Sequence, residues 1–354
     1  MAITSTGLQA SASLPRWFTP AALVGSFSLA LAAFTLSSLG GDSGPSLVAV
    51  ALIGFAIYLL VTVLVSRLVE GRRKAADRLV TSLVTAAFAL AVIPLVSLAW
   101  TVISNGLARL DIDFFTNSMR NIVGPGGGAL HAIVGTLELT LIASLISVPV
   151  GIMTAIYLVE YGRGRLAKAV TFFVDVMTGI PSIVAGLFAF TLFLVLLGPA
   201  AAINGFAGAI ALSVLMIPVV VRATEEMLKI VPNELREASY ALGVPKWLTI
   251  VKVVIPTALA GIATGVIIAI ARVIGETAPL LLAAGFTTSM NYNPFADKMM
   301  TLPVFVFTSF ANQGIDTQSY LDRSWAGALT LMLIVMILNL LARLISKFFS
   351  PKGS

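Results

Sequence analysis

Long apolar segments alternate with polar connections along the whole chain. Eight of them are long enough to cross a hydrocarbon core about 30 Å thick at about 1.5 Å per helical residue. They run at roughly 20–39, 46–66, 79–104, 130–158, 169–198, 203–222, 257–284 and 326–348. Backbone polar groups in a bilayer must bond within the chain, so each segment predicts a helix. The pattern therefore predicts an all-α integral membrane protein, a polytopic helical bundle of about eight transmembrane helices.

Composition agrees with this fold class. Of 354 residues, 58% are hydrophobic and 11% are charged, whereas a soluble domain carries about 25% charged residues. The chain has no cysteine and one histidine. Disulfides, Cys-ligated metals and multi-histidine metal sites are therefore excluded, and we predict no metal site.

Basic residues are distributed unevenly between the connections. Of 22 Lys and Arg residues, 17 lie in one alternate set of connections, one lies inside a span, and Arg109, Arg120, Lys298 and Arg323 lie in the other set. The positive-inside rule makes the first set cytoplasmic. We therefore predict a multi-pass protein of the plasma (inner) membrane with both termini cytoplasmic. The net charge of +6 then reflects topology and contact with membrane lipid, not nucleic-acid binding.

The basic linker at 66–78 is the clearest boundary. It predicts an N-terminal region 1–78, with a transmembrane hairpin turning at 40–45, then a core of six further spans at 79–348 and a tail at 349–354. The first span is about 20 residues long and lacks a convincing small-residue cleavage site, so we predict a retained helix and not a cleaved signal peptide.

The connection at 225–256 is too polar to cross a membrane and predicts a short helix. Pro232 suits a first helical position, Gly243 suits the left-handed position after the last turn, and Pro245 prevents continuation. One face carries small residues and leucines, at Leu235, Ala238, Ser239 and Leu242. From these residues alone, the face either packs on the protein's own helix ends or binds a partner.

The string Glu237-Ala238-Ser239, followed by Gly243 and by Val253-Val254-Ile255-Pro256, resembles the EAA signature of ABC importer permeases. The spacings agree, and the departures are Ser239 for alanine, Val253 for isoleucine and Ile255 for leucine. The resemblance implies a coupling loop at about 223–256 that docks on a cytoplasmic ATPase, with Glu237, Ala238, Ser239, Gly243 and Pro256 as its coupling residues. No G-x-x-x-x-G-K-[ST] sequence occurs. We therefore expect no cofactor in this chain, with ATP bound by a separate partner ATPase.

The seventh segment carries charges near the middle of the bilayer. Arg272 and Glu276 lie near its middle, and each charge costs about 2.5–3.5 kcal/mol there on insertion scales. On a helix they would face the same way, so they either neutralise each other or line a polar pathway for an anion. Pro279 cannot bond the carbonyl of Gly275, which predicts a helix break beside them.

This stretch narrows the resemblance to the PstA family of phosphate permeases. The string at 271–281, ARVIGETAPLL, is similar to that family's ARxxGETAPLL, and 217–225 and 302–304 resemble it too. The resemblance implies phosphate as the substrate and Arg222, Arg272 and Glu276 as candidate residues of an anion pathway. It also implies no enzymatic activity in this chain and three kinds of partner: a PstC-like permease subunit, two copies of an ATPase subunit, and an external phosphate-binding protein.

Two alternatives stay open. The EAA loop is shared by importers of other oxyanions, such as sulfate or molybdate, and an intramembrane Arg–Glu pair would also suit an ion-coupled secondary transporter. Among weaker polar candidates, Glu138 and Asp175 favour helix–helix hydrogen bonds, and His131 favours an interface role.

Overall fold

The computed structural model describes residues 13–38 and 46–349, so the predicted turn at 40–45 lies outside the described residues. Every regular element in these ranges is a helix, which confirms the all-α prediction. The chain forms two compact units, Met1–Ala99 and Trp100–Ser354.

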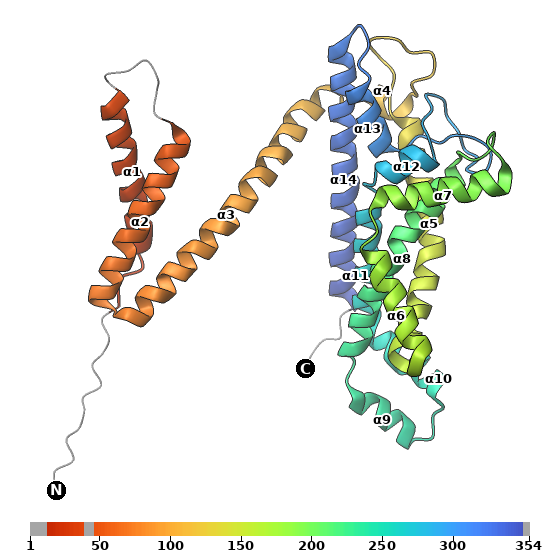
Figure 1. Cartoon of the computed structure of the whole chain (residues 1–354), viewed down its shortest axis with the longest axis horizontal. Helices are drawn as coiled ribbons and strands as arrows, with labels where there is room; N and C mark the ends of the chain where they lie inside the picture. Colours follow the sequence, from red (N-terminus) through yellow and green to blue (C-terminus); the bar gives the residue numbers. More distant parts are fainter. Residues whose placement is uncertain (1–12, 39–45, 350–354) are drawn as a thin grey trace. The chain divides into compact units, whose positions relative to one another are not determined.

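The first unit holds two antiparallel helices and most of a third: α1 (Phe18–Ser38), α2 (Leu47–Val69) and α3 (Arg72–Gly106) (Figure 1). Glu70, in the turn between α2 and α3, ties the unit together. Its carboxylate accepts hydrogen bonds from Arg78 Nε at 2.6 Å, Ser66 Oγ at 2.8 Å and the Leu14 amide at 2.8 Å. The hydrogen bond from Arg78 contributes most to lowering the pKa of Glu70 to about 2.

The second unit contains the remaining helices. In chain order they are the 3-10 turn η1 (Leu107–Arg109), α4 (Ile112–Thr116), α5 (Leu130–Ile156), the π-helical turn η2 (Tyr157–Tyr161), α6 (Gly164–Thr178), α7 (Ser182–Leu197), α8 (Gly205–Ile230), α9 (Asn233–Ala241), α10 (Lys246–Thr249), the π-helical turn η3 (Ile250–Val254), α11 (Ile255–Val273), α12 (Ala278–Ala283), α13 (Leu302–Ala311) and α14 (Thr317–Phe349).

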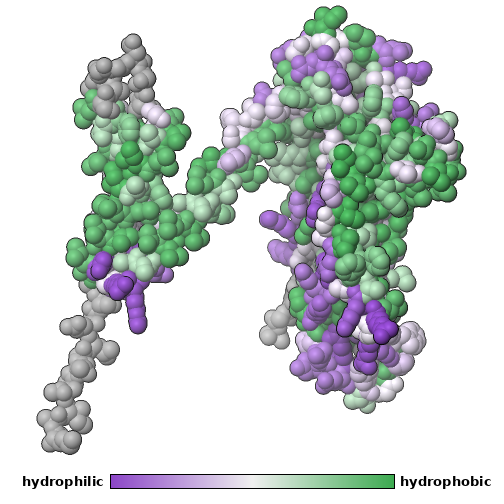
Figure 2. Space-filling view, viewed as in Figure 1, coloured by the Kyte–Doolittle hydropathy of each residue, from purple (hydrophilic) through white to green (hydrophobic). Residues whose placement is uncertain are grey.

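The core of this unit forms where α5 and α8 pack along each other, with α11 and α12 against α8 and with α13 against α14. Small residues let the backbones approach, as expected in membrane bundles. A Cβ at Gly135 of α5 would lie 2.0 Å from the Met300 carbonyl oxygen. Apolar side chains cover the middle of the unit, and hydrophilic ones gather at its two ends, including the end that carries α9 (Figure 2).

Seven helices in the described ranges are long and apolar enough to cross a membrane, and a bent pair brings the number to eight. Two predicted spans need correction. The segment 169–198 is not one straight span, because α6 and α7 meet at a bend of 107°. The segment 257–284 is not continuous either, because the spanning helix begins at Lys246 and ends at Val273.

Candidate functional site

Two broken helices border one cavity of about 210 Å³. The first break separates α6 from α7 at Gly179, Ile180 and Pro181. Pro181 has no N–H to continue the helix, and it disfavours helical geometry at Ile180. The cavity is lined by Met177, Thr178, Ile180, Ser182, Leu215, Pro218, Val219, Arg272, Val273 and Glu276.

The second break separates α11 from α12. Helix α11 ends at Val273, and α12 begins at Ala278 with Pro279 in its first turn. The Glu276 amide turns back to the Val273 carbonyl oxygen at 3.1 Å, which closes a tight turn around Gly275. The break lies where a missing N–H at Pro279 and a flexible Gly275 predict it.

Arg272 and Glu276 line the cavity together but form no ion pair with each other in the described part of the chain. Their four-residue spacing would join them only on a continuous helix, and the helix has already ended at Val273. The Arg272 side chain is exposed, and Glu276 is half-buried. Ser182 lines the same cavity, whereas the Thr178 hydroxyl donates to the Val174 carbonyl oxygen at 2.9 Å. The arrangement offers a planar cation and one neutral donor, groups that suit an oxyanion.

Close backbone contact holds the two broken helices together. A Cβ at Gly186 of α7 would lie 2.6 Å from the Cα atom of Pro279 in α12. Only glycine allows this approach, because the obstructing atoms belong to the backbone and cannot rotate away. The contact therefore holds α7 against α12 beside the two helix breaks that border the cavity.

Arg222 is placed elsewhere. Its guanidinium pairs with Asp175 of α6 and, at 2.6 Å, with Glu225 one turn further along α8. It does not line the cavity, although Pro218 and Val219 of the same helix do. The charge of Arg222 is therefore committed to two carboxylates, and Asp175 makes the helix–helix contact that its sequence position favours.

The predicted coupling helix is α9, in the connection between α8 and α10. Gly243 has φ +75°, and the Val244 amide bonds the Ser239 carbonyl oxygen at 3.2 Å, which ends the helix. The neighbouring helices reach further than the sequence suggests, because α8 continues to Ile230 and α10 begins at Lys246. Pro256 therefore lies in the first turn of α11 and not in the loop.

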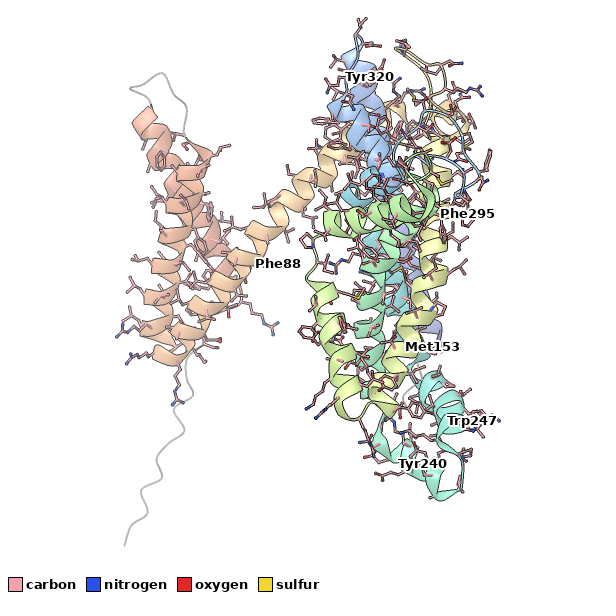
Figure 3. The ribbon with its side chains drawn as sticks, turned by 45° about the vertical axis from the view of Figure 1, so that its right-hand side comes forward. Phe88, Met153, Tyr240, Trp247, Phe295 and Tyr320 are labelled. Atoms are coloured by element: carbon pink, nitrogen blue, oxygen red, sulfur yellow. The ribbon has the colours of Figure 1, made fainter. Side chains whose placement is uncertain are left out.

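The face of small residues and leucines on α9 is divided, with Ser239 buried and with Leu235, Ala238 and Leu242 exposed. Ser239 is buried, and its hydroxyl lies 2.8 Å from the Thr249 hydroxyl, so it fixes α9 to α10. Glu237, Ala238 and Gly243 are exposed. Large apolar side chains are exposed beside them, and Tyr240 and Trp247 project from this end of the unit (Figure 3). Leu242 is 83% exposed.

His131 is buried inside the unit with its ring edge-on to Phe305, the centroids 5.7 Å apart. Glu138 is half-buried on α5, and it does not line the cavity. No group of three or more metal-ligating side chains occurs in residues 13–38 and 46–349.

Sequence reasoning missed two features of this unit. The break between α6 and α7 has a readable signal, Gly179 followed by Pro181. The ion pair between Glu160 of η2 and Arg236 of α9 has no readable signal in the sequence, because 76 positions separate the two residues.

Bundled spanning helices, two broken helices around a charged cavity and an exposed helix at one end define the class, a multi-pass membrane transport protein. A family model, the binding-protein-dependent transport system inner membrane component, matches residues 147–353. The fold is similar to that of a bacterial alginate ABC transporter in complex with an alginate pentasaccharide-bound periplasmic protein, with a TM-score of 0.56 and 13% identity over 79% of this chain and 97% of that one.

Curated relatives narrow the class. The chain is 47% identical to the phosphate transport system permease protein PstA 1 of Mycobacterium tuberculosis (strain CDC 1551 / Oshkosh), over 77% of this chain and 90% of the relative. It is 39% identical to the phosphate transport system permease protein PstA of Yersinia pestis, over 77% of this chain and 90% of the relative. The chain therefore belongs to the PstA family of ABC importer permeases.

Proposed function

We propose that this chain carries inorganic phosphate across the inner membrane as one permease subunit of an ATP-driven importer. The observation that supports this most is the cavity at the two helix breaks, which is lined by Arg272 and Ser182. A guanidinium presents planar donors that match phosphate oxygens. Broken helices at membrane depth are where many transporters hold their substrates. The names of the relatives give phosphate as the anion.

The proposed machine needs other chains. A PstC-like permease subunit would complete the pathway, two ATPase copies would bind ATP, and an external binding protein would deliver phosphate. Helix α9, with Glu237 and Ala238 exposed, would dock on one ATPase at the cytoplasmic side of the membrane. Both chain termini would lie on the same side. ATP-driven movement of α9 would switch the cavity between outward and inward access, with no covalent chemistry on phosphate.

The test is uptake of labelled phosphate into vesicles that hold the reconstituted complex. The proposal predicts uptake only when ATP is supplied to the ATPase side, and competition by unlabelled phosphate but not by sulfate or molybdate. Preferential competition by either of those anions would assign a different oxyanion. Uptake driven by an ion gradient without ATP would contradict the importer mechanism.

A further inference from the structure

Helix α9 is attached to the bundle by one well-buried ion pair. Arg236 of α9 meets Glu160 of η2, with Nη2 at 2.8 Å and Nε at 3.0 Å from the same carboxylate oxygen. The two side chains are 12% and 5% exposed. By contrast, the Lys229–Glu225 pair on α8 has its lysine 62% exposed. Exposed pairs of that kind contribute little, whereas breaking a buried pair leaves an uncompensated charge.

The same guanidinium also holds the end of α8. Nη1 donates to the Val231 carbonyl oxygen at 2.6 Å, and Nη2 donates to that of Leu228 at 3.0 Å. Arg236 therefore joins three elements: its own helix α9, the last turn of α8, and η2. A helix attached in this way cannot be displaced without moving η2 or breaking several charge-assisted hydrogen bonds.

Residues from the far side of the loop hold η2 as well. Lys246 of α10 donates to the Glu160 carbonyl oxygen, and its ammonium lies 4.9 Å from the centre of the Tyr161 ring. Arg236 and Lys246 thus both contact Glu160, and Lys246 also contacts the adjacent Tyr161. Turns of π-helix are rare and occur often at functional sites, and η2 is followed directly by α6.

Helix α6 leads from η2 to the cavity. It begins at Gly164, three residues after η2, and ends at Thr178, which lines the cavity beside Arg272. A helix of 15 residues transmits a displacement over about 22 Å at about 1.5 Å per residue. The path from α9 therefore runs through the Arg236–Glu160 ion pair and then along the backbone from η2 into α6 and to the cavity.

We propose that the Arg236–Glu160 pair is the link through which movement of α9 reaches the cavity. The proposal rests on the proposed function, in which α9 docks on the ATPase. Arg236 and Glu160 are positioning residues: they touch neither phosphate nor ATP. Their loss uncouples transport from hydrolysis while the complex still assembles, because the exposed face of α9 is not part of the pair.

The experiment uses the full reconstituted complex and measures phosphate uptake and ATP hydrolysis in the same vesicles. The variants are Glu160→Gln and Arg236→Gln. Arg236→Lys keeps the positive charge, and Lys229→Gln is the matched control in an exposed pair at the same end of the unit. Complex assembly is checked by co-purification of the ATPase.

We expect both Gln variants to co-purify with the ATPase and to hydrolyse ATP, with phosphate transported per ATP falling roughly tenfold, within the range known for residues that modulate coupling between sites. Arg236→Lys should recover part of the phosphate transported per ATP, and Lys229→Gln should leave that quantity unchanged. An unchanged ratio in the Gln variants, or a loss of ATPase co-purification in all three Arg236 and Glu160 variants, would overturn the proposal. If the unmodified complex transports no phosphate, the proposed function itself fails, and this shows before any variant is made.

Discussion

Gly243 provides the sharpest test of α9 as a docking helix. It has φ +75°, and a Cβ placed there would meet no atom within 4 Å. A β-carbon at this position therefore has room, and the main cost of Gly243→Val comes from the backbone. The left-handed region costs an L-residue roughly 1–2 kcal/mol, and a β-branched residue resists it most.

This strain acts on the end of α9. The Gly243 amide bonds the Tyr240 carbonyl oxygen at 2.9 Å, and the next amide bonds Ser239. At 1.4 kcal/mol per factor of ten, the strain lowers the equilibrium constant for the correctly ended helix by about 5-fold to 30-fold. Apparent affinity for the ATPase should fall by up to this factor, since only the competent conformation binds.

The assay titrates a labelled ATPase against the purified chain in mild detergent. Gly243→Asn is the matched control, because asparagine tolerates positive φ, and it should bind nearly as tightly as the unmodified chain. Unchanged affinity and normal uptake in Gly243→Val would refute the docking role of α9. Equal weakening in the Val and Asn variants would refute the conformational explanation.

Three further predictions concern topology, the N-terminal unit and the cavity. Cysteines introduced as Asn312→Cys and Leu242→Cys should be labelled by an impermeant thiol reagent from the outside and the inside respectively; labelling of both from one side would contradict the topology. The pKa of Glu70, lowered from 4.5 to about 2, means that its ionised form stabilises the fold. That stabilisation is present above about pH 4.5 and is lost as the pH falls towards about 2. Thermal unfolding at pH 6 and pH 3 should therefore show a smaller difference for Glu70→Gln than for the unmodified chain, and an equal difference would contradict it. Gly186→Leu should separate α7 from α12, because its Cβ would lie 2.6 Å from the Pro279 Cα atom. Phosphate uptake should then be lost while ATPase binding is retained. Normal uptake would show that the contact is dispensable.

The sequence predicts most of the fold because span length and the positive-inside rule depend on local composition. Helix α2 begins at Leu47 against a predicted start near 46, and α5 begins at Leu130 as predicted. The errors arise where a proline changes direction within an apolar run. Pro181 ends one helix and turns the chain by 107°, and hydropathy does not distinguish such a bend from a straight span.

The candidate site was only partly predictable. Arg272 and Glu276 are conspicuous because charge is costly in a membrane, and they do line the cavity. Their lack of an ion pair depends on where the helix ends, which spacing alone does not give. Arg222 looked equivalent to Arg272, but its partner Asp175 lies 47 positions away in sequence. Contacts of that range are set by packing and leave no local pattern.

The proposed anion pathway depends most on Arg272, because its guanidinium forms no ion pair in the described residues and Arg272 lines the cavity. The measurement is ATP-dependent phosphate uptake by vesicles with the reconstituted complex, comparing Arg272→Leu, Arg272→Lys and the double variant Arg272→Leu with Glu276→Leu. Assembly with the ATPase is checked separately.

If Arg272 attracts phosphate, both variants that lose the cation should assemble but transport poorly. Arg272→Lys should then keep part of the uptake, because the charge remains while the planar donors are lost. Near-normal uptake by the double variant would contradict the account and leave Arg272 with no part in the anion pathway.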